Sequence, residues 1–159
     1  MLARGLRPEH KFLDFGCGSL RNGVWIIRFL NPGNYYGIDA DRWQLEAGAR
    51  VEIPLHDLGT KVPRLLHNSE FRIDFFQVEY DWIFAFSVLN HLDPRRRAFA
   101  IERIISGMKD DAKFTISHRL PFEEQELYNR FRLQVVHEVE WPCKTIPSST
   151  MMFELKRAT

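Results

Sequence analysis

Cysteine is scarce in this chain of 159 residues, which contains only Cys17 and Cys143. Two cysteines so far apart form neither a disulfide framework nor a cluster with metal-ligand spacing. We therefore expect no metal site, and we expect a protein of a reducing compartment, with the cytoplasm as the default.

Long apolar runs and an excess of one charge are also missing. No stretch reaches the roughly 18 apolar residues of a membrane span, and residues 1–11 lack the apolar core of a signal peptide. The 22 basic and 21 acidic residues leave a formal net charge of +1. This balance gives no electrostatic reason to expect a nucleic acid or an anionic membrane as a partner.

The first quarter of the chain carries the strongest pattern. The apolar run Phe12–Phe15 is typical of a strand that is covered on both faces, and the glycine-rich turn Gly16–Ser19 follows it. An apolar helix separates this turn from a second strand, Tyr35–Ile38. That strand ends in Asp39, about 20 residues after the glycines, where a carboxylate can accept both hydroxyls of a ribose. The order of these elements predicts a nucleotide-type site.

The rest of the chain alternates strands and helices until a final hairpin. Asp41 is expected to cap a helix that runs to about Val51, and Asp93 to cap a second helix that begins at Pro94. The later elements are expected as strands over 71–78, 80–87 and 113–117, a helix over 121–131, and strands over 133–139 and 150–156 joined by a loop over 140–149. This alternation predicts a mainly parallel sheet with helices on both faces and an antiparallel edge.

Three segments resemble motifs of the class I S-adenosylmethionine-dependent methyltransferases. Leu13–Ser19 looks like their first motif, Tyr36–Asp39 like their second, and Tyr80–Leu92 like the motif at their fourth strand. The resemblance implies an α/β fold of three layers, a Rossmann-like doubly wound, mainly parallel sheet with a C-terminal antiparallel hairpin. We expect one compact domain over residues 1–159, with short or absent N-terminal lid helices. Leu20 stands where many family members carry a third glycine.

The resemblance also implies which residues hold S-adenosylmethionine. Asp14 would hold the methionine part indirectly, through its amino group, and the backbone of residues 16–18 would face the same part. Asp39 would bind the ribose hydroxyls, residues 40–41 would lie beside the adenine, and one of residues 68–70 would reach the adenine amino group. The full expected set is Asp14, Gly16, Cys17, Gly18, Ser19, Asp39, Ala40, Asp41, Ser69 and Ser87.

Methyl transfer from a sulfonium asks little acid–base chemistry of the protein, because the methyl group is already activated. Alignment of the acceptor with that methyl group would be the main contribution of the enzyme. A base is needed only if the acceptor is a hydroxyl or a protonated amine. His91 and His118, which follow the fourth and fifth strands, are the candidates, since histidine titrates near neutral pH.

Three classes of function stay open. The first is an enzyme that methylates a small-molecule or sugar-like acceptor by in-line displacement. The second is an NAD-dependent oxidoreductase, although Arg21 stands where its glycine fingerprint needs a third glycine. The third is a catalytically silent module that binds S-adenosylmethionine and takes its lid from another domain or an oligomeric partner. Arg95–Arg97 is expected to be a solvated helix face or a contact for an acidic partner.

Overall fold

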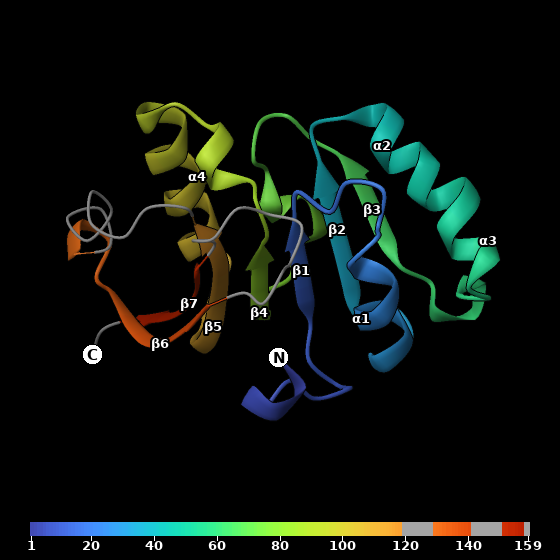
Figure 1. The fold of residues 1–159 in the computed structure, drawn as a ribbon, viewed down its shortest axis with the longest axis horizontal. Helices are drawn as coiled ribbons and strands as arrows, with labels where there is room; N and C mark the ends of the chain where they lie inside the picture. Colours follow the sequence, from blue (N-terminus) through green and yellow to red (C-terminus); the bar gives the residue numbers. More distant parts are fainter. Residues whose placement is uncertain (119–128, 141–150, 158–159) are drawn as a thin grey trace.

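Across residues 1–118, 129–140 and 151–157, the part of the chain that the computed structural model describes, seven strands form one sheet (Figure 1). Their order is β3-β2-β1-β4-β5-β7-β6. The first five strands run parallel, and β7 lies antiparallel between β5 and β6. The strands are β1 (Phe12–Phe15), β2 (Tyr35–Asp39), β3 (Arg64–His67), β4 (Tyr80–Ala85), β5 (Met108–His118), β6 (Leu133–Glu140) and β7 (Met151–Arg157). The predicted Rossmann-like sheet with antiparallel C-terminal strands is confirmed.

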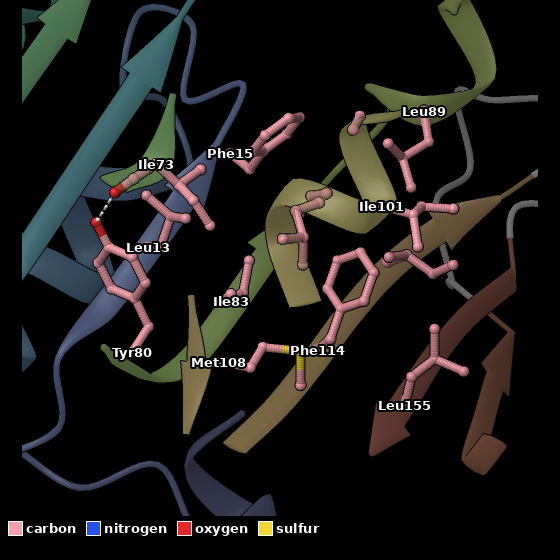
Figure 2. Close-up of a cluster of buried hydrophobic side chains, with 14 of the residues drawn as sticks. Leu13, Phe15, Ile73, Tyr80, Ile83, Leu89, Ile101, Met108, Phe114 and Leu155 are labelled. Atoms are coloured by element: carbon pink, nitrogen blue, oxygen red, sulfur yellow. Dashed lines mark hydrogen bonds between the residues drawn. The ribbon is translucent and has the colours of Figure 1, made fainter. Parts of the chain in front are cut away.

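Helices cover both faces of this sheet. They are α1 (Gly23–Phe29), α2 (Arg42–Ala47), α3 (Ile53–Leu55) and α4 (Pro94–Ser106). On one face, Val24 and Ile27 of α1 pack in a buried cluster with Phe12 and Trp82 of the sheet. The other face carries a second cluster, in which Ile101 and Ile104 of α4 lie with Leu13, Ile83, Phe114 and Leu155 (Figure 2). The hydrophobic core thus consists of two clusters, one between each face of the sheet and the helices that cover it.

The two predicted helix caps are present. The Asp41 carboxylate accepts hydrogen bonds from the backbone N–H groups of Trp43 and Gln44, and Asp93 does the same for Arg95 and Arg96. Each cap satisfies N–H groups that have no partner within their helix. The helix that Asp41 caps continues beyond its predicted end, since a π-helical turn, η2 (Gly48–Glu52), joins α2 to α3.

The predicted third strand is wrong in position. Residues 71–78 form no strand, and Ile73–Phe76 is a 3-10 helix, η4, flanked by Phe71 and Gln77 in the left-handed region (φ 54 for both). The strand beside β2 is Arg64–His67 instead. It lies at the edge of the sheet with side chains that are half-buried or exposed. Of residues 71–78, Phe71 and Ile73 are buried in the core, whereas Phe75 is exposed. The Ile73 carbonyl accepts a hydrogen bond from the buried Tyr80 hydroxyl (Figure 2).

Two expected segments fall in the rest of the chain. The helix expected over 121–131 lies mostly in residues 119–128, and the loop expected over 140–149 lies almost entirely in residues 141–150, both outside the described ranges. Within those ranges, no helix combines the length and the hydropathy that crossing a membrane requires.

Candidate functional site

A pocket of about 360 Å³ opens at the carboxyl ends of the parallel strands. It lies over β1, β2 and β4, where the order of the strands reverses, which is the usual ligand position in an open α/β sheet. Its lining residues are Phe15, Gly16, Ile38, Asp39, Ala40, Asn68, Phe71, Phe86, Ser87, Val88, His91, Leu92 and Arg96. The pocket therefore brings together the glycine turn, the end of β2 and the segment that follows β4.

The glycine turn after β1 depends on its glycines. Gly16 and Gly18 have φ values of 78° and 51°, in the region that residues with a side chain rarely adopt. At Gly16 space is also missing, since a Cβ atom there would lie 2.2 Å from Cγ2 of Val88. The backbone N–H groups of Gly16 and Cys17 donate to the carbonyl of Ile38 at 2.8 and 3.1 Å, which ties the turn to β2.

Leu20 occupies the position of the third family glycine and keeps the glycine-like backbone. Its φ is 65°, and its side chain is fully buried in the cluster under α1. A left-handed backbone costs a side-chain-bearing residue roughly 1–2 kcal/mol. Burial of the leucine side chain, worth about 1.5–3 kcal/mol, offsets this cost.

Asp39 connects the turn with the end of β2. Its Oδ2 accepts from the Gly18 N–H and its Oδ1 from the Asp41 N–H, both at 2.7 Å. An ionised carboxylate has about four lone-pair positions, so two remain for a ligand in the pocket that Asp39 lines. This arrangement fits the two hydroxyls of a ribose.

Asp14 lies buried below the glycine turn. The Tyr35 hydroxyl donates to its Oδ2 at 2.6 Å, and the described residues include no ion pair to it. Burial raises the pKa of Asp14 to about 7, with a smaller contribution from the Asp39 charge, and outweighs the Tyr35 hydrogen bond, which lowers it. Asp14 is not among the residues that line the pocket, so its carboxyl could act on the ammonium group of the cofactor's methionine part only indirectly.

The other expected cofactor residues lie at different depths. Ala40 and Ser87 line the pocket, whereas Cys17 is buried behind the turn, where burial raises the pKa of its thiol far above the ordinary value. Such a thiol is no nucleophile. Ser19 and Asp41 flank the pocket in sequence without lining it. Ser69, although it lies in the loop after β3, is not among the lining residues either, and its hydroxyl donates to the side chain of Glu70.

The two candidate bases differ in position. His91 is exposed and lines the pocket at the end of the 3-10 turn η5 (Leu89–His91). His118 is the last residue of β5, and its side chain lies outside the described part of the chain. For metal binding, the described residues contain no group of three or more His, Cys, Asp or Glu side chains that could hold an ion.

Sequence reasoning missed the role of two arginines. Arg96 lines the pocket, its guanidinium lies 5.3 Å from the centre of the Phe71 ring, and its Nη2 donates to the Ser69 carbonyl at 3.2 Å. Arg97 donates to the carbonyls of Leu89 and Leu92. The run is therefore not only a solvated helix face. The position of this arginine run in the first turn of α4, just after β4, is the sequence feature that indicates a place beside the strand ends.

Comparison with known proteins agrees with this geometry. Residues 13–114 match the family model described as a methyltransferase domain. The magnesium protoporphyrin IX methyltransferase of Synechocystis PCC 6803, solved with bound SAM, superposes with a TM-score of 0.80 at 14% identity, over 99% of this chain and 74% of that chain. A TehB-like SAM-dependent methyltransferase from Corynebacterium glutamicum gives 0.74 at 17% identity, over 98% and 83%. An rRNA methylase from Streptococcus thermophilus gives 0.67 at 14% identity, over 99% and 92%.

The family model spans more than half of the chain, including the glycine turn, the Asp39 strand and the segment after β4. The solved structures share the fold at identities too low to carry more than that. The family match decides against the NAD-dependent oxidoreductase. The chain belongs to the methyltransferase-domain family, and it is an enzyme that uses S-adenosylmethionine as its methyl donor.

Proposed function

We propose that this enzyme transfers the methyl group to a small-molecule acceptor, sugar-like or otherwise, by in-line displacement. The observation that carries the proposal is the composition of the pocket rim. Beyond the residues expected to hold the cofactor, the rim presents His91, Leu92 and Arg96, a titratable, an apolar and a cationic side chain. A rim of this kind suits a compact molecule with both apolar and polar groups.

The charge of the chain supports the same choice. A formal net charge of +1 provides little of the phosphate neutralisation on which nucleic-acid binding rests. Among the structural neighbours, one is named as a methyltransferase of a porphyrin and another as a methylase of rRNA, so the fold itself leaves the acceptor open. The near-neutral net charge favours a small-molecule acceptor for this chain.

The protein contributes mainly position to the reaction. When bound, S-adenosylmethionine supplies an activated methyl group on a cationic sulfur. Asp39, the glycine turn and Ser87 would fix the donor, and His91, Leu92 and Arg96 would hold the acceptor in line with it. Such alignment alone can correspond to an effective concentration of about 10⁵–10⁸ M. His91 would accept the proton of a hydroxyl acceptor.

A fractionation experiment tests this proposal. The purified chain is incubated with methyl-labelled S-adenosylmethionine and, separately, with the low-molecular-mass and macromolecular fractions of a cell extract. We expect label in a small molecule and formation of S-adenosylhomocysteine with the first fraction. Label found only in RNA or protein would overturn the proposal.

Two histidine variants test the proposed base. His91→Ala should lower turnover with a hydroxyl acceptor by roughly 10²–10⁴-fold. His56→Ala is the matched control, because His56 lies on the outer helices beside Glu52 and Trp25. Equal turnover of the two variants would exclude His91 as the base.

A further inference from the structure

The segment between β4 and α4 forms one whole wall of the pocket. Phe86, Ser87, Val88, His91 and Leu92 all belong to it and line the cavity. The segment begins with an unusual backbone, since Ser87 has a φ of 58°, in the left-handed region. For a residue other than glycine this conformation costs of order 1–3 kcal/mol and persists only where the surroundings hold it.

A residue outside the pocket holds Ser87 in place. The Ser87 N–H donates to Oγ of Ser117 at 2.6 Å. The parallel pairing of β4 with β5 ends at Ala85 and Ile116, so the strand ladder offers no partner to the Ser87 N–H. Ser117 lies on β5 with only 2% of its surface exposed. Its hydroxyl thus replaces a backbone acceptor at the point where β4 leaves the sheet.

The hydrogen bond between Ser87 and Ser117 also affects the packing against the glycine turn. Because Ser87 turns the chain, Val88 comes to lie directly beside Gly16, where its Cγ2 fills the space that a Cβ atom would need. The far end of the segment is fixed independently, since Arg97 donates to the carbonyls of Leu89 and Leu92. The start of the wall, and with it the contact to the glycine turn, depends on Ser117.

We propose that Ser117 is a positioning residue of the S-adenosylmethionine site. Its hydroxyl keeps Ser87 in the left-handed conformation, which seats Val88 against Gly16 and preforms the pocket wall before the cofactor binds. Ser117 itself does not line the cavity. The inference rests on the use of S-adenosylmethionine and is independent of the proposed small-molecule acceptor.

A double-mutant cycle tests it through the binding of S-adenosylhomocysteine, measured by calorimetric titration. Ser117→Ala should weaken binding roughly tenfold, or about 1.4 kcal/mol. The same change in a Ser87→Gly background should weaken it by less than about threefold, because glycine adopts a positive φ without the support of a hydrogen bond. If Ser117 only stabilised the fold, Ser117→Ala would lower the affinity equally in the wild type and in the Ser87→Gly variant.

Thr115 provides the matched control. It lies two residues earlier on the same face of β5, is also buried, and accepts a hydrogen bond from the Trp82 indole N–H at 2.9 Å. Thr115→Val should lower thermal stability yet leave the affinity for S-adenosylhomocysteine within about twofold. Hydrogen–deuterium exchange of residues 86–92 without ligand should be faster in Ser117→Ala and unchanged in Thr115→Val. Unchanged exchange in Ser117→Ala, or equal affinity losses in the two variants, would overturn the proposal.

Discussion

At the scale of single residues, the buried carboxyl of Asp14 makes the stability of the fold depend on pH. Its pKa is raised to about 7 in the folded chain, chiefly by burial, whereas an unfolded chain leaves it near 3.8. A raised pKa means that the folded state favours the protonated form. The contribution of this group to stability is therefore complete below pH 4 and is lost as the pH rises towards 7.

We predict that Asp14→Asn stabilises the protein at neutral and alkaline pH. Asparagine cannot ionise, and its amide oxygen can still accept the Tyr35 hydroxyl, so the free energy of unfolding at pH 8 should rise by roughly 2–4 kcal/mol. Denaturant unfolding at pH 4 and pH 8 measures the difference, which should nearly vanish at pH 4. A gain that is equal at the two pH values would contradict this account. The exposed Asp111→Asn is the control.

Asp39 gives the second prediction at this scale. Asp39→Asn removes the charge and leaves one oxygen to serve both the Gly18 and Asp41 N–H groups, so the glycine turn and the ribose contacts suffer together. We expect the affinity for S-adenosylhomocysteine to fall by roughly 10–100-fold, as measured by calorimetric titration. Glu46→Gln, at an exposed ion pair with Arg42 on α2, should bind like the wild type. Equal affinities of the two variants for S-adenosylhomocysteine would show that Asp39 does not contribute to binding.

At the scale of elements, α4 illustrates how a short signal can place a helix. The Asp93 carboxylate accepts from the N–H groups of Arg95 and Arg96, and Pro94 opens the helix. We predict that Asp93→Ala lowers the free energy of unfolding by about 1 kcal/mol, while Asp93→Ser, which can cap the helix as well, changes it by only a few tenths. Denaturant midpoints measure both. A loss of similar size in the two variants would mean that the charge of Asp93 matters and its cap does not.

Elements with a local signal could be predicted from the sequence. The strands at the centre of the sheet are mostly apolar because both of their faces are covered, and the helix starts carry their caps in the sequence. The edge strand Arg64–His67 lacks such a signal, since it presents exposed residues to solvent. The apolar residues that follow resemble a strand in sequence, but in the 3-10 helix that they form only Ile73 is buried.

Some residues of the candidate site could likewise be predicted from local sequence, and others could not. The glycine turn and Asp39 follow from spacing along the chain, and the structure brings both to the pocket. The contributions of Arg96 and Ser117 depend on contacts between elements far apart in sequence, such as the bond from Ser87 to Ser117. No local pattern encodes such a contact. This is why Ser87 and His91 of the pocket wall could be predicted, whereas the residues that hold the wall in place could not.

At the scale of the whole molecule, a charged cluster links the N-terminal segment to the last strand. Glu154 of β7 pairs with Arg4 at 3.4 Å and with Lys113 of β5 at 3.1 Å. Burial alone would raise the pKa of Glu154, but the hydrogen bonds from Arg4 and Lys113 outweigh it and hold that pKa below its usual value. A lowered pKa stabilises the fold at neutral pH, and this contribution is lost as the pH falls through the folded-state value.

We predict that Glu154→Gln destabilises the protein at pH 7 by about 1–2 kcal/mol, because it leaves two cations without their carboxylate. The difference from the wild type should shrink towards zero at pH 3, where the carboxyl of the wild type is protonated. Thermal or denaturant unfolding at the two pH values measures it. A deficit of the same size at pH 3 would show that shape, and not charge, holds this cluster together.

The place of β7 in the sheet has a consequence for the order of events during synthesis. It is the last strand along the described chain, yet it lies between β5 and β6. Until it has left the ribosome, β5 exposes an unpaired edge, and β6 has no neighbour to join. During this interval the nascent chain therefore carries an open hydrogen-bonding edge on β5, and we expect it to be most exposed to wrong strand pairing then.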